Sequence, residues 1–174
     1  EEQVGGQLHE ATIGKLVVNQ LRETLPNFVY TYSHHSCAAY LLDEGQFLTW
    51  CATPGRTSYL YIEYILGATL YAMMDGMSVA EMIGVIFQLV NALYLGWNKF
   101  RFHHNDLHTR NVMLRDVGQE IMVPYLLGQP GQYIKSRYLA QMIDFGLSTA
   151  QYQGIDLYPF SSFVEYSSFR NDMH

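Results

Sequence analysis

The chain has 174 residues, enough for one domain with a substantial buried core. Apolar residues make up 49% of it and charged residues only 15%, a composition that argues against a disordered tail. The net charge of −6 argues against a general affinity for nucleic-acid backbones or anionic lipid. We therefore expect no nucleic acid among its partners.

The N-terminus lacks the basic and apolar stretches of a signal peptide and has no initiator methionine. We expect the sequence to start partway through a longer product. The most apolar stretch, Met82 to Trp97, is too short to span a bilayer, so we expect a buried helix and no membrane span. Cys37 and Cys51 are expected to be reduced thiols in a cytoplasmic protein.

The first half of the chain alternates between helical and extended patterns. Apolar residues at helical spacing predict a helix from Glu10 to about Thr24. Aromatic and β-branched residues predict strands at Phe28–Tyr32 and at Tyr59–Tyr64, with a loop between them that holds glycine and proline.

The second half is expected to begin with a long helix. Ser78 and Glu81 form a capping box, which predicts a helix through about Lys99. Strand-like pieces follow at 111–114, 120–127 and 132–143, and we expect the tail from Asp156 to start another helix. This order is typical of a mixed α+β fold rather than of a regular βαβ alternation.

The strongest chemical signal follows the long helix directly. Residues 104–111 fit the pattern H-x-D-x-x-x-x-N, with Asp106 and Asn111 at the two key positions. Phosphoryl transfer needs a carboxylate to orient the attacking hydroxyl and a nearby amide oxygen to hold Mg²⁺. The alternative interpretation of this pattern alone is a polar turn after a helix.

A second motif, Asp144-Phe145-Gly146, follows the apolar residues Met142 and Ile143. A D-F-G triplet by itself is common. Behind an apolar strand and after H-x-D-x-x-x-x-N, it indicates a second carboxylate for Mg²⁺ that bridges nucleotide phosphates.

With these motifs in this order, residues 9 to 165 resemble the eukaryotic-like protein kinase superfamily. The segments LRETLPNF, HHNDLHTRNVMLR and MIDFG look most like divergent kinase-like proteins of large DNA viruses. The resemblance implies a single incomplete α+β protein-kinase-like domain over 1–174. Residues 9–66 would form a partial small lobe (one helix, two strands) and hinge, and 67–174 the helical core and catalytic loop of a partial large lobe.

The resemblance also implies roles for individual residues. Asp106 would orient the nucleophile, and Asn111 and Asp144 would hold Mg²⁺. His108 stands where serine/threonine kinases place lysine, whereas Arg110 stands where tyrosine kinases place an arginine. Asp106 and Arg110 are the residues expected to act in catalysis.

The resemblance places the nucleotide-binding hinge in the segment from Tyr61 to Leu70. Ile62 would be its gatekeeper, and the backbones of Glu63 and Ile65 would meet the adenine of ATP. Glu10 would be the glutamate of the regulatory helix, and Asp156 would anchor the catalytic loop.

Three departures from the family pattern limit this expectation. Neither a Gly-rich loop nor a nucleotide-gripping lysine precedes Glu10, since Lys15 follows it. The chain stops soon after Asp156, and Asn105 replaces the usual arginine of H-R-D. We expect exposed strand edges, a protein partner or further segments that complete the small lobe, and no turnover by these residues alone.

The expected function is ATP- and Mg²⁺-dependent transfer of the γ-phosphate to a protein substrate, at serine or threonine rather than tyrosine, in a cytoplasmic protein (host cytoplasm or virion if viral). Three alternatives stay open. They are a pseudokinase or structural module without turnover, a small-molecule kinase of the aminoglycoside or choline type, and a metallohydrolase built on His103, His104, Asp106 and His108.

Overall fold

The computed structural model describes residues 2–37, 57–127 and 131–159. Its first element is one continuous helix made of α1 (Glu2–Ile13), a π-helical turn η1 (Gly14–Val18) and α2 (Asn19–Arg22). The predicted helix is confirmed, although it begins at Glu2 rather than Glu10. A Cβ on Gly14 would overlap the Thr31 side chain, so glycine lets the following strand lie directly against the helix.

Strands β1 (Thr31–Cys37) and β2 (Thr57–Ile62) form an antiparallel pair that packs on this helix. Both strands were predicted, but β1 begins at Thr31 rather than at Phe28, which instead makes a parallel bridge to Met142. Cys51 lies outside the described residues. Within the described ranges the β1–β2 sheet has two strands, so each has one edge without a strand neighbour, as expected.

Helix α4 (Val79–Phe100) carries the predicted capping box and ends at Arg101 in the left-handed region, with φ 50°. Its buried side holds two amides that bond to neighbouring strands. Gln88 donates to the Tyr138 carbonyl, and Asn91 donates to that of Pro124. The helix predicted from the capping box through about Lys99 is confirmed. It extends beyond the apolar stretch Met82 to Trp97, and by length and composition alone it is one helix among the described residues that could cross a membrane. Its bonded polar side is typical of a helix packed in a globular core.

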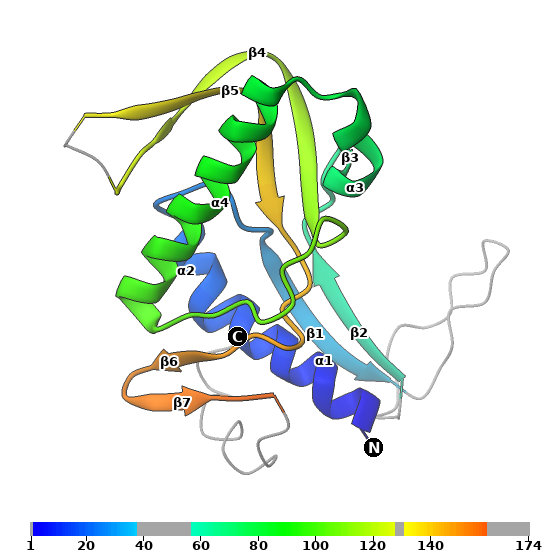
Figure 1. Ribbon diagram of the computed structural model, residues 1–174. Helices are drawn as coiled ribbons and strands as arrows, with labels where there is room; N and C mark the ends of the chain where they lie inside the picture. Colours follow the sequence, from blue (N-terminus) through cyan, green and yellow to red (C-terminus); the bar gives the residue numbers. More distant parts are fainter. Residues whose placement is uncertain (1, 38–56, 128–130, 160–174) are drawn as a thin grey trace, which may run out of the picture.

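A short strand β3 (Ala68–Thr69) leads into helix α3 (Leu70–Met73) and the 3-10 turn η2 (Met74–Gly76). Strand β3 pairs with β4 (Val112–Pro124), which pairs in turn with β5 (Tyr133–Met142). The separate strand pieces expected from sequence are therefore one long hairpin that arches over α4 (Figure 1).

The last described elements are β6 (Ala150–Tyr152) and β7 (Ile155–Leu157), a small antiparallel hairpin. Asp156 lies in β7, where it accepts a hydrogen bond from Gln151. The expected helix start at Asp156 is therefore wrong, because the turn at Gln153–Gly154, with positive φ at both residues, folds the chain into a hairpin here. The role expected of Asp156 as an anchor of the catalytic loop is also not seen.

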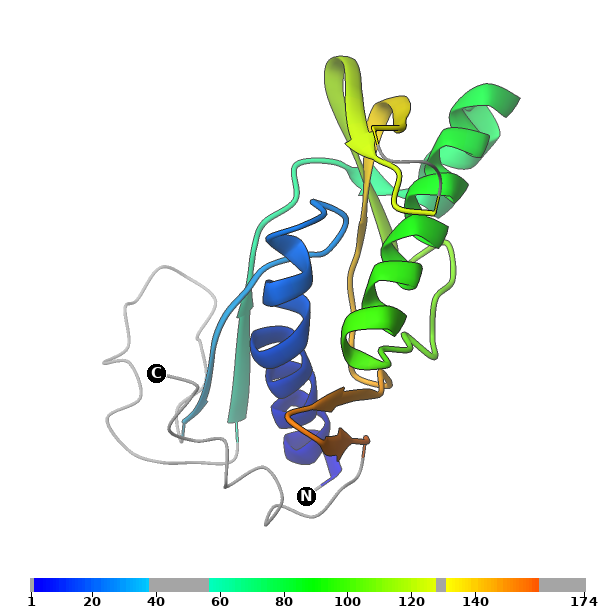
Figure 2. The same cartoon turned by 90° about the vertical axis from the view of Figure 1, so that its left-hand side faces the viewer.

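Figure 2 shows the helix α1–η1–α2 lying between the β1–β2 pair on one side and β5 with α4 on the other. Its buried residues form one core with Phe28, Phe102, Met142 and Phe145, so the H-x-D and D-F-G segments both rest on the same apolar centre. The architecture is thus mixed α+β, as predicted.

Candidate functional site

The loop from Arg101 to Asn111 is held at its start by close packing under α4. A Cβ on Gly96 would lie 2.9 Å from Phe102, so glycine makes room for this ring. Phe102 is buried and meets Phe28 and Phe145 edge-on, at ring-centroid distances of 6.2 and 6.1 Å. The aromatic contact joins the loop before Asp106 to the D-F-G segment.

The structure brings together three side chains that the sequence predicted to act together. The Asn111 amide nitrogen lies 3.4 Å from Asp106 Oδ2 and 3.5 Å from Asp144 Oδ2, and it donates to the Asp106 carbonyl at 3.1 Å. The backbone N–H of Ile143 donates to the Asn111 carbonyl, which fixes the two segments side by side. Asp144 has φ 65°, in the left-handed region. This conformation is costly for a non-glycine residue and persists because the surrounding structure holds it.

This group of residues offers oxygen atoms and net negative charge. The Asn111 amide nitrogen is the atom that faces both carboxylates, and no described residue donates a hydrogen bond to the amide oxygen. Two carboxylates and an amide oxygen are ligands that Mg²⁺ prefers, and substrate phosphates commonly complete its coordination. These residue types are therefore compatible with Mg²⁺, and the binding of Mg²⁺ stays a prediction.

Glu10 lies beside this group. Its Oε1 accepts a hydrogen bond from the Phe145 N–H at 3.3 Å, which places the α1 carboxylate at the D-F-G turn. Burial raises the pKa of the Glu10 carboxyl, and the nearby negative charge of Asp144 raises it further. Within the described ranges no lysine or arginine forms an ion pair with Glu10. The site thus has an excess of negative charge.

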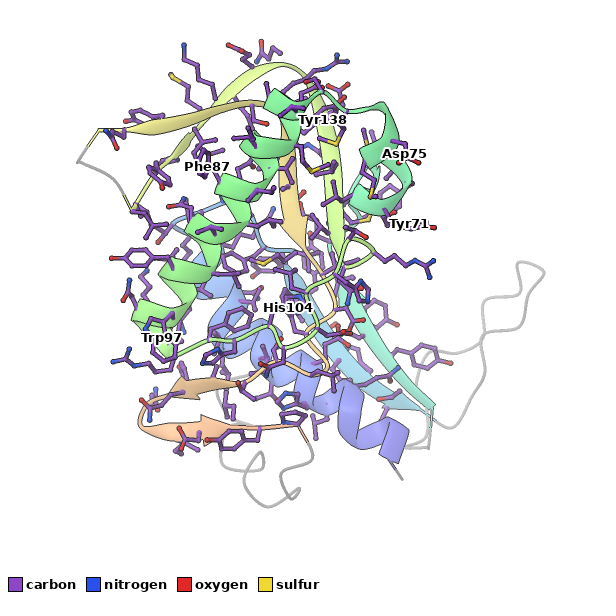
Figure 3. The ribbon with its side chains drawn as sticks, viewed as in Figure 1. Tyr71, Asp75, Phe87, Trp97, His104 and Tyr138 are labelled. Atoms are coloured by element: carbon purple, nitrogen blue, oxygen red, sulfur yellow. The ribbon has the colours of Figure 1, made fainter. Side chains whose placement is uncertain are left out.

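Two buried histidines fix the backbone around Asp144. His104 Nε2 donates to the Ile143 carbonyl at 3.0 Å, and His9 Nε2 donates to the Ser148 carbonyl at 2.7 Å. Burial lowers the pKa of both imidazoles, so both favour the neutral form. His104 lies at the centre of the molecule (Figure 3), and its inward orientation was not predicted.

Arg110 and His108 occupy different surroundings. The Arg110 guanidinium stacks over the Tyr71 ring at 4.6 Å, while His108 Nε2 lies 4.0 Å from Asp106 Oδ1. The Arg110 N–H donates to His108 Nδ1, so a neutral His108 carries its proton on Nε2, on the side of Asp106. His108 therefore lies within 4.0 Å of Asp106, whereas Arg110, the basic residue predicted to act in catalysis, stacks on Tyr71.

The hinge residues lie at the end of β2. The Glu63 side chain pairs with Arg22 at 2.6 Å, and its N–H donates to the Tyr30 carbonyl at 2.8 Å. No hydrogen bond among the described residues engages the Glu63 carbonyl or the Ile65 backbone, and their contact with adenine stays a prediction. Ile65 is buried, whereas Ile62 is 41% exposed.

The histidines of the catalytic loop do not converge on one point. His104 faces inward to Ile143, and His103 packs against Trp97 at a ring distance of 4.9 Å. Over the described ranges, no group of three or more His, Cys, Asp or Glu side chains is arranged to hold a metal ion. This arrangement disfavours the metallohydrolase alternative.

Sequence comparisons place relatives of this chain in invertebrate iridescent viruses. The chain is 30% identical over 163 residues to the uncharacterized protein 035R of Invertebrate iridescent virus 3, an alignment that covers 85% of this chain and 15% of that protein. It is 33% identical over 94 residues to "Probable kinase 098L" of the same virus, covering 53% of this chain and 18% of that protein.

An uncharacterized protein, 179R of Invertebrate iridescent virus 6, is 23% identical over 151 residues, which are 81% of this chain and 12% of that protein. No protein-family model matches the chain. The chain therefore spans less than a fifth of the length of these relatives, one of which is named a probable kinase.

Proposed function

We propose that this chain forms the catalytic-loop part of an ATP-dependent phosphotransferase of the protein kinase type. The observation that carries the proposal is the convergence of Asp106, Asn111 and Asp144, which come from two separate segments and meet around one amide. The name of the relative "Probable kinase 098L" supports the same class. Bound Mg²⁺-ATP would supply the γ-phosphate and neutralise the charge that develops on it.

In this proposal each side chain has one task. Asp106 orients the hydroxyl of a protein substrate and accepts its proton, while Asn111 and Asp144 hold the cation. The hinge backbone at Glu63 and Ile65 contacts the adenine. Glu10 has no cationic partner among the described residues. We propose that further polypeptide or a partner protein supplies one.

The test combines a nucleotide-binding titration, with and without Mg²⁺, and a phosphate-transfer assay. The 174-residue chain should bind Mg²⁺-ATP weakly at most and show no measurable turnover, because Glu10 has no lysine to position. In a polypeptide that supplies the lysine, Asp106→Asn should keep nucleotide binding and lose turnover by several orders of magnitude, since positioning and charge provide nearly all catalysis in this class. Robust phosphate transfer by the 174-residue chain alone would contradict the proposal that further polypeptide or a partner protein supplies the cationic partner of Glu10.

A pseudokinase or kinase-derived interaction module is the second candidate. It is favoured because no lysine or arginine among the described residues pairs with Glu10. It predicts no transfer from any longer polypeptide, with Asp106→Asn indistinguishable from wild type. On either proposal the expected setting is the host cytoplasm or the virion.

A further inference from the structure

The segment that follows Asp144 is held by hydrogen bonds at almost every residue. Phe145 donates to Glu10, the Ser148 carbonyl accepts from His9, and Ser148 Oγ donates to the His104 carbonyl at 3.2 Å. Thr149 exchanges two backbone bonds with His103, at 2.8 and 2.9 Å. The segment is therefore fixed both to α1 and to the catalytic loop.

Asn105 makes the side-chain bonds that complete this attachment. Its amide nitrogen donates to the Leu147 carbonyl at 3.0 Å and to Thr149 Oγ1 at 3.2 Å. The Asn105 NH₂ group thus donates twice to the segment 145–149 and makes no hydrogen bond to residues next to it in sequence. The bonds span 42 and 44 positions of sequence, so they join two distant parts of the chain.

The backbone at Asn105 suits asparagine in particular. Its φ is 60°, in the left-handed region where asparagine is several times more common than most other non-glycine residues. The residue directly precedes Asp106, so a change in its conformation would redirect that carboxylate. One residue therefore sets the direction of the catalytic loop and holds the segment behind Asp144.

Apart from the Glu10 carboxyl that accepts from Phe145, the attachment uses no charged side chain. Residues 145 to 149 receive no hydrogen bond from any lysine or arginine among the described residues. The hydroxyls of Ser148 and Thr149 are both engaged, and the Ser148 side chain is fully buried. The Ser148 hydroxyl could not carry a phosphate without losing its bond to the His104 carbonyl.

We propose that Asn105 is a positioning residue that holds segment 145–149, and with it Asp144, in the metal-binding arrangement without any phosphate. This inference rests on the proposed function. Its consequence is that the uncharged Asn105 amide holds the metal-binding residues in place, so phosphorylation of the segment is not needed to activate the site. Asn105 touches no substrate; it acts through the backbone that carries Asp144.

The main test is Asn105→Asp, which keeps the shape and the tolerance of positive φ but removes the two N–H donors. Amide hydrogen exchange at 145–149 should speed up by about tenfold or more, because the segment loses two bonds and gains a carboxylate facing the Leu147 carbonyl. Mg²⁺-dependent nucleotide affinity should fall severalfold in parallel, while the affinity without Mg²⁺ stays the same. A merely structural role would change the two affinities together.

Two further variants sharpen the result. Thr149→Val removes one acceptor and leaves the Leu147 bond, so its exchange effect should be smaller than that of Asn105→Asp. Gln153→Gly is the matched control for Asn105→Gly, because Gln153 is also exposed with φ 50° and bonds only within its own turn. Exchange at 145–149 should respond to Asn105→Gly alone.

The outcomes separate this inference from the proposed function. Unchanged exchange at 145–149 in Asn105→Asp would overturn the inference, whatever the nucleotide affinities are. Faster exchange with no Mg²⁺-dependent binding in the wild type would keep the hydrogen-bonded attachment and refute the proposed function. Loss of Mg²⁺-dependent affinity from wild type on phosphatase treatment would overturn the claim that no phosphate is needed.

Discussion

At the scale of single residues, the fold disfavours protonation of the two buried histidines. His9 and His104 each use Nε2 on a backbone carbonyl near Asp144. Because burial places the folded-state pKa of both below the ordinary value of 6.5, the neutral forms are favoured in the fold. Their contribution to stability is therefore complete above about pH 6.5 and is lost as the pH falls below it.

His9→Gln is expected to reduce this dependence, because glutamine can still donate to the Ser148 carbonyl and cannot titrate. The free energy of unfolding should fall less steeply between pH 6.5 and 5 in the variant than in the wild type, as measured by urea unfolding. Burial raises the pKa of Glu10, which opposes this trend. Glu10 and His104 are present in both proteins, so the difference between the two profiles reports on His9. Parallel pH profiles would contradict the assignment to His9.

At the scale of elements, α4 contains two buried glycines in different surroundings. A Cβ on Gly84 would meet only ordinary contacts, the nearest at 3.5 Å, whereas one on Gly96 would meet Phe102 at 2.9 Å. Gly84→Ala should stabilise the protein by up to about 1 kcal/mol through helix propensity. Gly96→Ala should destabilise it by about 1–3 kcal/mol through overpacking. Equal shifts in urea midpoint would contradict this account of the loop's start.

The capping box at the start of α4 gives a second test. Ser78 Oγ accepts from the Glu81 N–H, and the Glu81 carboxylate accepts from the Ser78 N–H at 2.8 Å. Ser78→Ala should cost about 1 kcal/mol, whereas Ser78→Gly should cost only a few tenths. Urea unfolding of both variants measures the difference, and no loss in Ser78→Ala would show that packing alone sets the helix start.

Sequence patterns predicted the features that depend on residues close together in the chain. The capping box predicted the start of α4 correctly. The order of the two motifs predicted that Asp106, Asn111 and Asp144 lie close together, and they do. The start of β1 was misplaced, because Phe28 is drawn into the core by Phe102 and Met142, contacts far away in sequence. The hydrogen bonds of Asn105 could not have been predicted either, since they join residues more than forty positions apart.

At the scale of the whole molecule, α4 presents one uncharged apolar face to solvent. Its seven large residues are between 41% and 77% exposed, and Phe87 and Trp97 lie along the same side in Figure 3. They are Val79, Ile83, Ile86, Phe87, Val90, Tyr94 and Trp97. An open hollow of about 500 Å³ continues the face beyond Tyr94 and Trp97 toward His103. Continuous apolar faces of this kind are typical of interaction surfaces.

The chain is therefore expected to self-associate as its concentration rises. Ile86→Lys with Val90→Lys should shift the chain toward monomer in sedimentation experiments, because two charges would be buried in the contact. Met122→Lys is the control, since Met122 is 63% exposed on the β4–β5 hairpin rather than on α4. A wild type that stays monomeric at all concentrations would contradict the expectation.

The proposed function depends most on a cation that Asp144 and its neighbours hold against nucleotide phosphates. The most direct measurement is a nucleotide titration with and without Mg²⁺, on wild type, Asp144→Asn and the control Asp156→Asn, whose carboxylate lies on the β6–β7 hairpin. We predict that Mg²⁺ strengthens binding in wild type and Asp156→Asn but not in Asp144→Asn. Binding that ignores Mg²⁺ in wild type, or that survives unchanged in Asp144→Asn, would contradict the account.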